Sequence, residues 1–420
     1  MVAQEQTGMA CGVKAAIAIV ALSAIVLLML ASCSAAQKQE STSSQATASA
    51  SQQSGSSQEA SSAAAESKTP TVENLSLIED TDFGGVLFDI AIEDFNKYGF
   101  DYGDSVDIVF SNGYELIGIP YYNGYYSEMG DPLLVGYPGN SHIKATINYG
   151  DSLWKTAGVS EDDTATITLN EAGACSLVQE AFSISYTDER NDYESDEQFA
   201  NFRELAGGSI LHGIAYRSAS PIDNAHNRVP YAEKFMEQAS VKYVLDLADS
   251  SDEVDGFAVE DAEQDIDVSY FMDLRDAGNV GMLDLSVSYS SDDFAQKLAA
   301  GLIEMSEHEG PYLVHCLEGK DRTGFVCALL EALCGATYDE MLDDYMITYQ
   351  NYYGITRESD PDKYDVIADL NLNGMLQYLA GVDDDADLSA IDYSGYARDY
   401  LVNGGMTDEQ VDALVQRLTA

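Results

Sequence analysis

The pattern of apolar and polar positions divides the chain into four stretches of different character. Residues 15–30 form one apolar run behind Lys14, whereas residues 34–70 contain almost no large apolar side chain. Residues from about 71 to 185 show the period of two that is typical of strands, and later residues alternate between short apolar runs and helical spacing. We therefore expect a leader, a linker, a small mostly-β domain over 71–185 and an α/β domain over 186–420.

Asn-Gly pairs mark tight turns in the first folded stretch. Apolar runs at 106–110 and 114–119 flank one such pair, which predicts a hairpin, and residues 164–169 alternate as a further strand. A second Asn-Gly pair lies between the tyrosines of 121–126 and predicts another hairpin. These tyrosines suit half-buried strands, or alternatively a stacking platform for a sugar or peptide. A small β-sandwich or barrel is expected, and its role is left open.

The second folded stretch alternates strands with helices. Strands are predicted at 214–219, 241–247 and 311–315, and helices at 230–239, 292–307, 322–334, 338–353 and 408–418. The acid-rich residues 249–267 are expected to form an exposed loop. This alternation predicts a central, largely parallel sheet flanked by helices, in which ligands bind at the carboxyl ends of the strands.

The apolar run near the N-terminus ends in Leu30-Ala31-Ser32-Cys33. This tetrapeptide resembles the bacterial lipobox, which implies removal of a signal peptide over 1–32 and a lipid on the sulfur of Cys33. The alternative is an uncleaved membrane anchor. Residues 33–70 are too rich in Ser, Ala and Gln to fold and are expected to be a disordered tether. We expect an extracytoplasmic protein, anchored to the bacterial cell membrane as a lipoprotein through Cys33.

The charge, the cysteines and the histidines argue against nucleic-acid binding, against a disulfide between Cys327 and Cys334 and against a metal or cofactor site. The chain has 72 acidic and 20 basic residues, a net charge of −52, so nucleic-acid binding is not expected and any phosphate site must be a local positive spot. Cys327 and Cys334 lie seven apart on one predicted helix, too far to bond to each other, and are expected to pack in the core. The histidines show no ligand spacing, so neither a metal site nor a cofactor is expected.

The stretch with the clearest chemistry is 315–324, His-Cys-Leu-Glu-Gly-Lys-Asp-Arg-Thr-Gly, which follows a predicted strand and precedes a predicted helix. Backbone N–H groups of such a loop converge where the helix begins, and they favour an anion there and a thiolate at Cys316. Arg322 can bind two phosphate oxygens, Thr323 can donate to the sulfur, and Lys320 adds charge at the rim. A carboxylic acid is expected nearby for proton transfer.

This decapeptide resembles the His-Cys-x5-Arg-Thr signature of cysteine-dependent protein tyrosine phosphatases. Its Gly-Lys-Asp-Arg-Thr variant is similar to that of secreted bacterial phosphatases with mixed phosphotyrosine and phosphoinositide activity. Asn201-Phe202-Arg203 and Tyr216-Arg217-Ser218 resemble upstream elements of that family. The resemblance implies that Cys316 is the nucleophile, that Arg322 clamps the phosphate and that His315 supports the thiolate. It also implies a substrate-binding loop of Leu317, Glu318, Gly319, Lys320, Thr323 and Gly324.

Two residues are candidates for the general acid. Asp321, within the loop, is the first, and Asp246, at the end of a predicted strand, is the second. The family reads Asp-Leu-Arg at the second place, whereas here Asp246-Leu247 is followed by Ala248.

The implied activity is hydrolysis of phosphotyrosine, phosphoserine/threonine or phosphoinositide monoesters, so the expected partners are a phosphorylated protein or a phosphoinositide. The alternatives are a non-catalytic phospho-ligand-binding or adhesive surface lipoprotein, and a rhodanese-type sulfurtransferase, against which the Gly-Lys-Asp-Arg-Thr run argues.

Overall fold

The structure, a computed structural model, describes residues 69–383 and 385–420. The predicted signal peptide, Cys33 and nearly all of the predicted tether lie outside these residues. No helix within the described ranges is long and apolar enough to cross a membrane.

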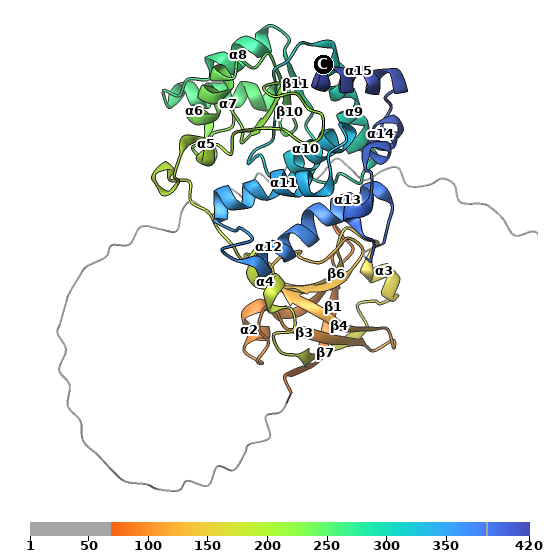
Figure 1. Ribbon diagram of the computed structural model, residues 1–420. Coiled ribbons are helices and arrows are strands. Elements are labelled where there is room, and N and C mark those ends of the chain that lie inside the picture. The colour runs from red at the N-terminus through yellow and green to blue at the C-terminus, as the bar shows by residue number, and fades with distance from the viewer. Residues whose placement is uncertain (1–68, 384) are drawn as a thin grey trace, which may run out of the picture. The chain divides into compact units, whose positions relative to one another are not determined.

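Seven strands close into a barrel in the order β1-β2-β6-β5-β4-β3-β7, seen at the bottom of Figure 1. Every neighbouring pair is antiparallel except β4 and β5, which run parallel. Buried apolar side chains fill the interior, and the short helices α2 (Ile92–Asn96) and α3 (Leu153–Ala157) add to this core. The strands are β1 (Thr71–Glu79), β2 (Val86–Ala91), β3 (Ser105–Phe110), β4 (Glu115–Tyr122), β5 (Pro132–Val135), β6 (His142–Ile147) and β7 (Thr164–Glu171).

One of the two predicted hairpins is confirmed and the other is wrong. β3 and β4 pair across Asn112-Gly113, with Gly113 at φ +91°, a conformation that suits glycine. At the second Asn-Gly pair the chain instead leaves the barrel wall. The side chain of Gln179 in α4 (Ser176–Phe182) accepts from the N–H of Asn123 at 3.1 Å and donates to its side-chain oxygen at 2.8 Å. Asn123 is therefore hydrogen-bonded to a helix, whereas a hairpin would place a second strand opposite this position.

A separate five-stranded sheet has the order β11-β10-β12-β9-β8. Its strands are β8 (Arg203–Glu204), β9 (Ala215–Ser218), β10 (Tyr243–Asp246), β11 (Val280–Met282) and β12 (Tyr312–His315). The first four in spatial order run parallel, and only β8 is antiparallel to its neighbour. The register sets His315 beside both Asp246 and Ser218, so the carboxyl ends of three strands lie level at the point where β12 ends.

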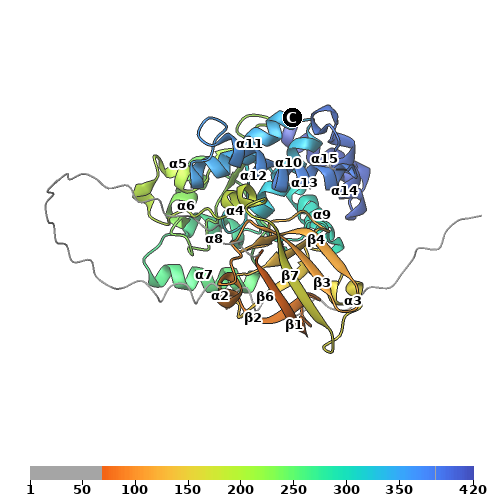
Figure 2. The same ribbon diagram turned by 90° about the horizontal axis from the view of Figure 1, so that it is seen from below.

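Helices cover both faces of this sheet (Figures 1 and 2). Leu245 and Val314 belong to a core with α9, α10 and α15, whereas Val244 and Leu313 belong to a core with α6, α7 and α8. This alternation follows from the period of two in a strand. The helices are α5 (Asp196–Phe199), α6 (Val229–Gln238), α7 (Ser251–Glu263), α8 (Ser269–Asp276), α9 (Asp292–Glu307), α10 (Asp321–Leu333), α11 (Tyr338–Tyr353), α12 (Pro361–Ala368), α13 (Gly374–Ala380), α14 (Ser394–Asn403) and α15 (Asp408–Thr419).

The acid-rich stretch predicted to be an exposed loop is mostly helical, so that prediction is wrong. Ser250 and Glu253 form a reciprocal capping box that starts α7, and Val254 is fully buried against the sheet. Acidic side chains at a helix N-terminus are stabilised by the helix dipole, so the charges that suggested a loop support the first turn of the helix.

Candidate active site

The residues around Cys316 form the turn between the central strand β12 and the N-terminus of α10. Strand extensions on either side hold this turn: the N–H of Leu247 donates to the carbonyl of His315 at 2.9 Å, and the N–H of Ser220 donates to that of Leu317 at 3.0 Å. Cys316 therefore lies at the carboxyl edge of the sheet, and only 3% of it is exposed. This is where ligands bind in parallel α/β sheets.

Gly319 sets the path of the loop. Its φ is +67°, and a Cβ on this residue would lie 2.2 Å from the carbonyl oxygen of Ser218. Its carbonyl accepts from the guanidinium of Arg217 at 2.9 Å and from the side-chain amide of Asn201 at 3.2 Å. The loop thus approaches β9 more closely than any side chain at Gly319 would permit.

Arg203 and Arg217 form internal ion pairs below the loop. Arg203 Nε donates to Asp344 of α11 at 2.8 Å, and Arg217, 1% exposed, donates to the other oxygen of the same carboxylate. Burial acts to raise the pKa of Asp344, but the two guanidinium groups outweigh it and hold that pKa below its usual value. Both arginines therefore form internal ion pairs, and Arg217 also holds the loop through the carbonyl of Gly319.

His315 and Asp246, two of the predicted supporting residues, are enclosed in the protein. Burial lowers the pKa of His315 to about 3, so its ring is neutral. The ring Nε2 lies 4.0 Å from Asp246 Oδ2. The other oxygen of Asp246 accepts from the N–H groups of Ala248 and Asp249 at 2.9 and 3.2 Å, and burial raises the pKa of this carboxyl. Asp246 therefore caps the turn after its own strand.

The remaining predicted loop residues divide between the rim and the interior. Thr323 is fully buried, and its hydroxyl has no hydrogen-bond partner among the described residues. Gly324 lies inside α10, where a Cβ would come within 2.6 Å of the ring of Tyr345. Glu318 and Leu317 are partly buried at the loop itself.

The charge of Lys320 is compensated within the loop. Its Nζ lies 3.1 Å from Glu318 Oε2 and 3.8 Å from Asp321 Oδ2. Burial acts to lower the pKa of Lys320, but these two carboxylates raise it well above the usual value, so the side chain stays protonated. Glu318 also accepts from the hydroxyl of Tyr186. Lys320 is thus a member of an ion-pair cluster and offers little uncompensated charge to a ligand.

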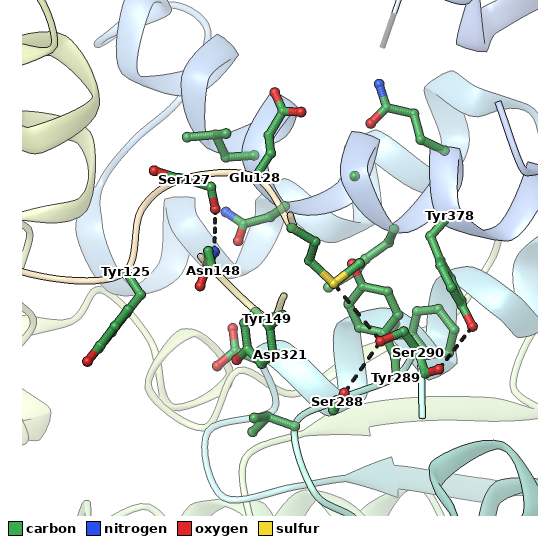
Figure 3. Close-up of a pocket in the computed structure, with 18 of the residues that line it drawn as sticks. Tyr125, Ser127, Glu128, Asn148, Tyr149, Ser288, Tyr289, Ser290, Asp321 and Tyr378 are labelled. Carbon is green, nitrogen blue, oxygen red and sulfur yellow. Dashed lines mark hydrogen bonds between the residues drawn. The ribbon is translucent and has the colours of Figure 1, made fainter. Parts of the chain in front are cut away.

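A cavity of about 600 Å³ opens beside the start of α10 (Figure 3). Asp321, Arg322 and Phe325 line it, whereas Cys316 and Asp246 are not among its lining residues. Arg322 Nη1 donates to the carbonyl of Leu285 at 3.1 Å. The other walls come from residues 287–290 and Phe294, from residues within 369–382, the segment that contains α13, and from two connections of the barrel, at 125, 127–129 and 148–149.

The barrel residues of this cavity are the part of the site that the sequence analysis missed. Tyr149 lies beside Asp321 in Figure 3. Its side chain is 64% exposed, and its pKa is raised by partial desolvation first and by the charge of Asp321 second. The run Asn148-Tyr149-Gly150-Asp151 has the composition of a turn, which predicts a loop but does not tell what the loop faces. Across residues 69–383 and 385–420, no group of three or more His, Cys, Asp or Glu side chains is arranged to hold a metal ion.

Residues 196–420 match the family model described as the tyrosine phosphatase family. The match covers more than half of the chain and includes the loop from His315 to Gly324, so the protein belongs to the tyrosine phosphatase family. Membership supports a phosphatase activity for the α/β region. The barrel lies outside the matched residues, and no curated protein matches the chain.

Two of the solved structures that resemble this chain are both distant from it in sequence. One is an uncharacterized conserved protein from Thermotoga maritima, 22% identical, with a TM-score of 0.20, matched over 24% of this chain. This chain spans 37% of that protein. The other is the core catalytic domain of the PP-IP phosphatase SIW14 from S. cerevisiae in complex with citrate, 16% identical, with a TM-score of 0.23, over 39% of this chain and 87% of that one.

Proposed function

We propose that the protein hydrolyses phosphate monoesters, with phosphotyrosine as the leading substrate, through a cysteinyl-phosphate intermediate on Cys316. The observation that carries this proposal is the placement of Cys316 and Arg322 on either side of one short turn, between the central strand and the N-terminus of α10. Loop amides and a helix N-terminus favour a phosphate at that point, and a guanidinium binds two of its oxygens.

The proposed reaction has two displacements at phosphorus. The thiolate of Cys316 attacks, an S–P bond forms, and the P–O bond to the substrate breaks while the departing oxygen takes a proton from an acid. Water then attacks the cysteinyl phosphate, gives a proton to the same carboxylate, and releases inorganic phosphate and the thiolate. Arg322 binds the equatorial oxygens in both steps, and Thr323 donates its hydroxyl to the departing sulfur.

We propose Asp321 as the acid. Its side chain is 58% exposed and lines the cavity together with Arg322, so it can reach a leaving group held there. Asp246 is fully buried and already accepts two backbone N–H groups. Asp321→Asn should lower kcat by about 10²–10⁴-fold, because a positioned acid contributes that much. Asp246→Asn keeps a side-chain oxygen that can accept from these two N–H groups, so this variant should retain turnover. A larger loss of kcat in Asp246→Asn than in Asp321→Asn would contradict the assignment.

Hydrolysis of a chromogenic aryl phosphate tests the function itself. Cys316→Ser should lower turnover on the order of 10³-fold or more, because the hydroxyl is a far weaker nucleophile. Cys175→Ser, in a half-buried cysteine beside the barrel, is the matched control and should leave turnover intact. Full activity in Cys316→Ser would refute the mechanism. Phosphopeptide binding without any wild-type turnover would instead support a non-catalytic phospho-ligand-binding surface protein.

We further propose that the enzyme acts outside the cytoplasm, as a lipoprotein held by Cys33. The support is the lipobox-like sequence before Cys33 and the polar residues that follow it. Fractionation of cells tests this location: Cys33→Ala should move the protein out of the membrane fraction and abolish labelling by a fatty acid. Unchanged fractionation and labelling would rule out this anchor.

A further inference from the structure

The cavity beside Arg322 has a wall that does not belong to the phosphatase region. Residues 125–129 come from the connection between β4 and β5, and Asn148 and Tyr149 follow β6. All of them precede residue 196, where the family match begins. Where the two regions meet at the cavity, Ser290 Oγ lies 4.0 Å from the sulfur of Met129, and Tyr149 lies beside Asp321 (Figure 3). The barrel therefore borders the space next to the proposed acid.

The lining is poor in positive charge. Glu128, Asp321 and Asp369 contribute carboxylates, and Arg322 is the only Lys or Arg among the described residues that line the cavity. Lys320, the other base of the loop, lies against Glu318 and Asp321. When Arg322 holds one phosphate, further anionic groups on the same ligand would meet carboxylates. Repulsion in a partly desolvated cleft is stronger than in water.

Aromatic side chains make up much of the remaining wall. Tyr149 from the barrel, Tyr289 and Phe325 from the α/β region, and Tyr378 of α13 all line the cavity (Figure 3). Tyr289 stacks on Phe325 with ring centroids 4.7 Å apart. Tyrosines present a flat apolar face and a hydroxyl, which suits an aromatic ring and the peptide backbone next to it.

Tyr149 has an unusual backbone as well as this position. Its φ is +49°, in the left-handed region that non-glycine residues seldom adopt. A bulky residue kept in that conformation beside a cavity is a candidate for a functional role, because outliers of this kind gather at ligand sites.

From these observations we propose that the barrel is the outer wall of the substrate cleft and selects the leaving group. It favours a phosphorylated tyrosyl side chain in a neutral or basic peptide segment and disfavours multiply phosphorylated ligands such as phosphoinositides. Tyr149 is the barrel residue that contacts the peptide. This inference rests on the proposed phosphatase function and deepens it, because it gives the otherwise unassigned barrel a part in substrate choice.

Binding to the Cys316→Ser variant tests the cleft separately from turnover. Calorimetry with a phosphotyrosyl peptide flanked by lysines should give a Kd at least about 10-fold lower than with the same peptide flanked by glutamates. Adding Tyr149→Asn, which keeps a residue tolerant of positive φ but removes the ring, should weaken binding of the lysine-flanked peptide about 5-fold. Tyr98→Asn, at an exposed tyrosine of the barrel that does not line the cavity, is the matched control and should not change Kd.

Charge variants test the second half of the proposal. In the same background, Glu128→Gln with Asp369→Asn should reduce the preference for the basic peptide and should strengthen binding of a short-chain phosphoinositide bisphosphate by about 5-fold. Glu161→Gln, at an exposed acid of the barrel away from the cavity, should change neither affinity.

Two sets of results would overturn the proposal. Equal binding of the two peptides, unaffected by Tyr149→Asn, would show that the barrel has no part in the cleft. Tighter binding of the bisphosphate than of the basic peptide would reverse the proposed selectivity. Both results are compatible with hydrolysis of a small aryl phosphate, so they would leave the phosphatase function standing. Conversely, absence of turnover combined with the predicted affinities would refute the enzyme but not the cleft.

Discussion

The carbonyl oxygen of Gly319 accepts hydrogen bonds from Asn201 and Arg217, which precede it in the chain by 118 and 102 residues. Both donors can reach this oxygen because the loop passes directly against β9. That close passage needs a residue without a Cβ and with a positive φ, and glycine alone satisfies both conditions. The shape of the proposed phosphate site therefore depends on one backbone position that itself carries no functional group.

Gly319→Ala should abolish most of the activity and lower the free energy of unfolding. The left-handed backbone alone costs an alanine about 1 kcal/mol, and the clash with Ser218 must also displace the loop. Gly354→Ala is a matched control, since Gly354 has the same φ of +67° but open space where its Cβ would lie. Phosphatase assays and chemical denaturation measure both effects. If the two variants had equal activity, the close passage would not matter for function.

At the scale of elements, apolar periodicity predicted the long helices well. The helix expected over 338–353 is α11, and that expected over 292–307 is α9, because each has one apolar face that a single core covers. The helix α7 was missed because its only fully buried apolar residue is Val254, too few for a visible period. The second hairpin failed because Gln179, far along the chain, bonds Asn123. Local turn chemistry cannot reveal such a partner.

Glu233 of α6 gives an element-scale prediction for pH dependence. Its Oε1 accepts from the N–H groups of Tyr270 and Phe271 in the first turn of α8, and burial raises its pKa to about 7. Between about pH 4.5 and pH 7 the folded protein keeps a proton that the unfolded chain releases. The free energy of unfolding should therefore fall as pH rises through this window, by up to about 3 kcal/mol from this group.

Denaturant titrations at pH 5 and pH 8 measure that contribution. Glu233→Gln keeps an oxygen acceptor for α8 but cannot ionise, so its loss of stability between the two pH values should be smaller than in the wild type. Glu307→Gln, at an exposed position of α9, should behave like the wild type. An identical pH dependence in all three proteins would show that Glu233 does not titrate with folding.

At the scale of the whole molecule, the cavity at the candidate site is lined by residues of both the barrel and the α/β region, and no sequence pattern links these two regions. The motif from His315 to Gly324 and its flanking strand and helix were predicted from local pattern, and the structure places them in that order. The two acid candidates also differ in burial, which a single sequence does not give: Asp246 is fully buried, whereas Asp321 is exposed and lines the cavity. The contribution of Tyr149 needs the packing of a barrel connection against the α/β region, for which a single sequence carries no signal.

The net charge of −52 creates a negative electrostatic potential that repels every approaching anionic substrate. Raising ionic strength from about 0.01 M to about 0.15 M shortens the Debye length from about 30 Å to about 8 Å and screens this repulsion. We expect kcat/KM for a small aryl phosphate dianion to rise over this range, whereas that for a lysine-rich phosphopeptide should fall. Steady-state rates at constant pH measure both trends. Two trends of the same sign would mean that the global field does not govern substrate encounter.

The odd number of strands in the barrel has a further consequence. A ring of strands in which every neighbour reverses direction can close only with an even number of members. This ring has seven, so at least one pair must run the same way, and that pair is β4 with β5. Such a pair cannot be joined by a tight turn, because the chain must travel back along the barrel before it starts the next strand. Residues 125–129 belong to that return path. The odd strand count thus makes an excursion obligatory, and the excursion brings Tyr125, Glu128 and Met129 to the cavity beside Arg322.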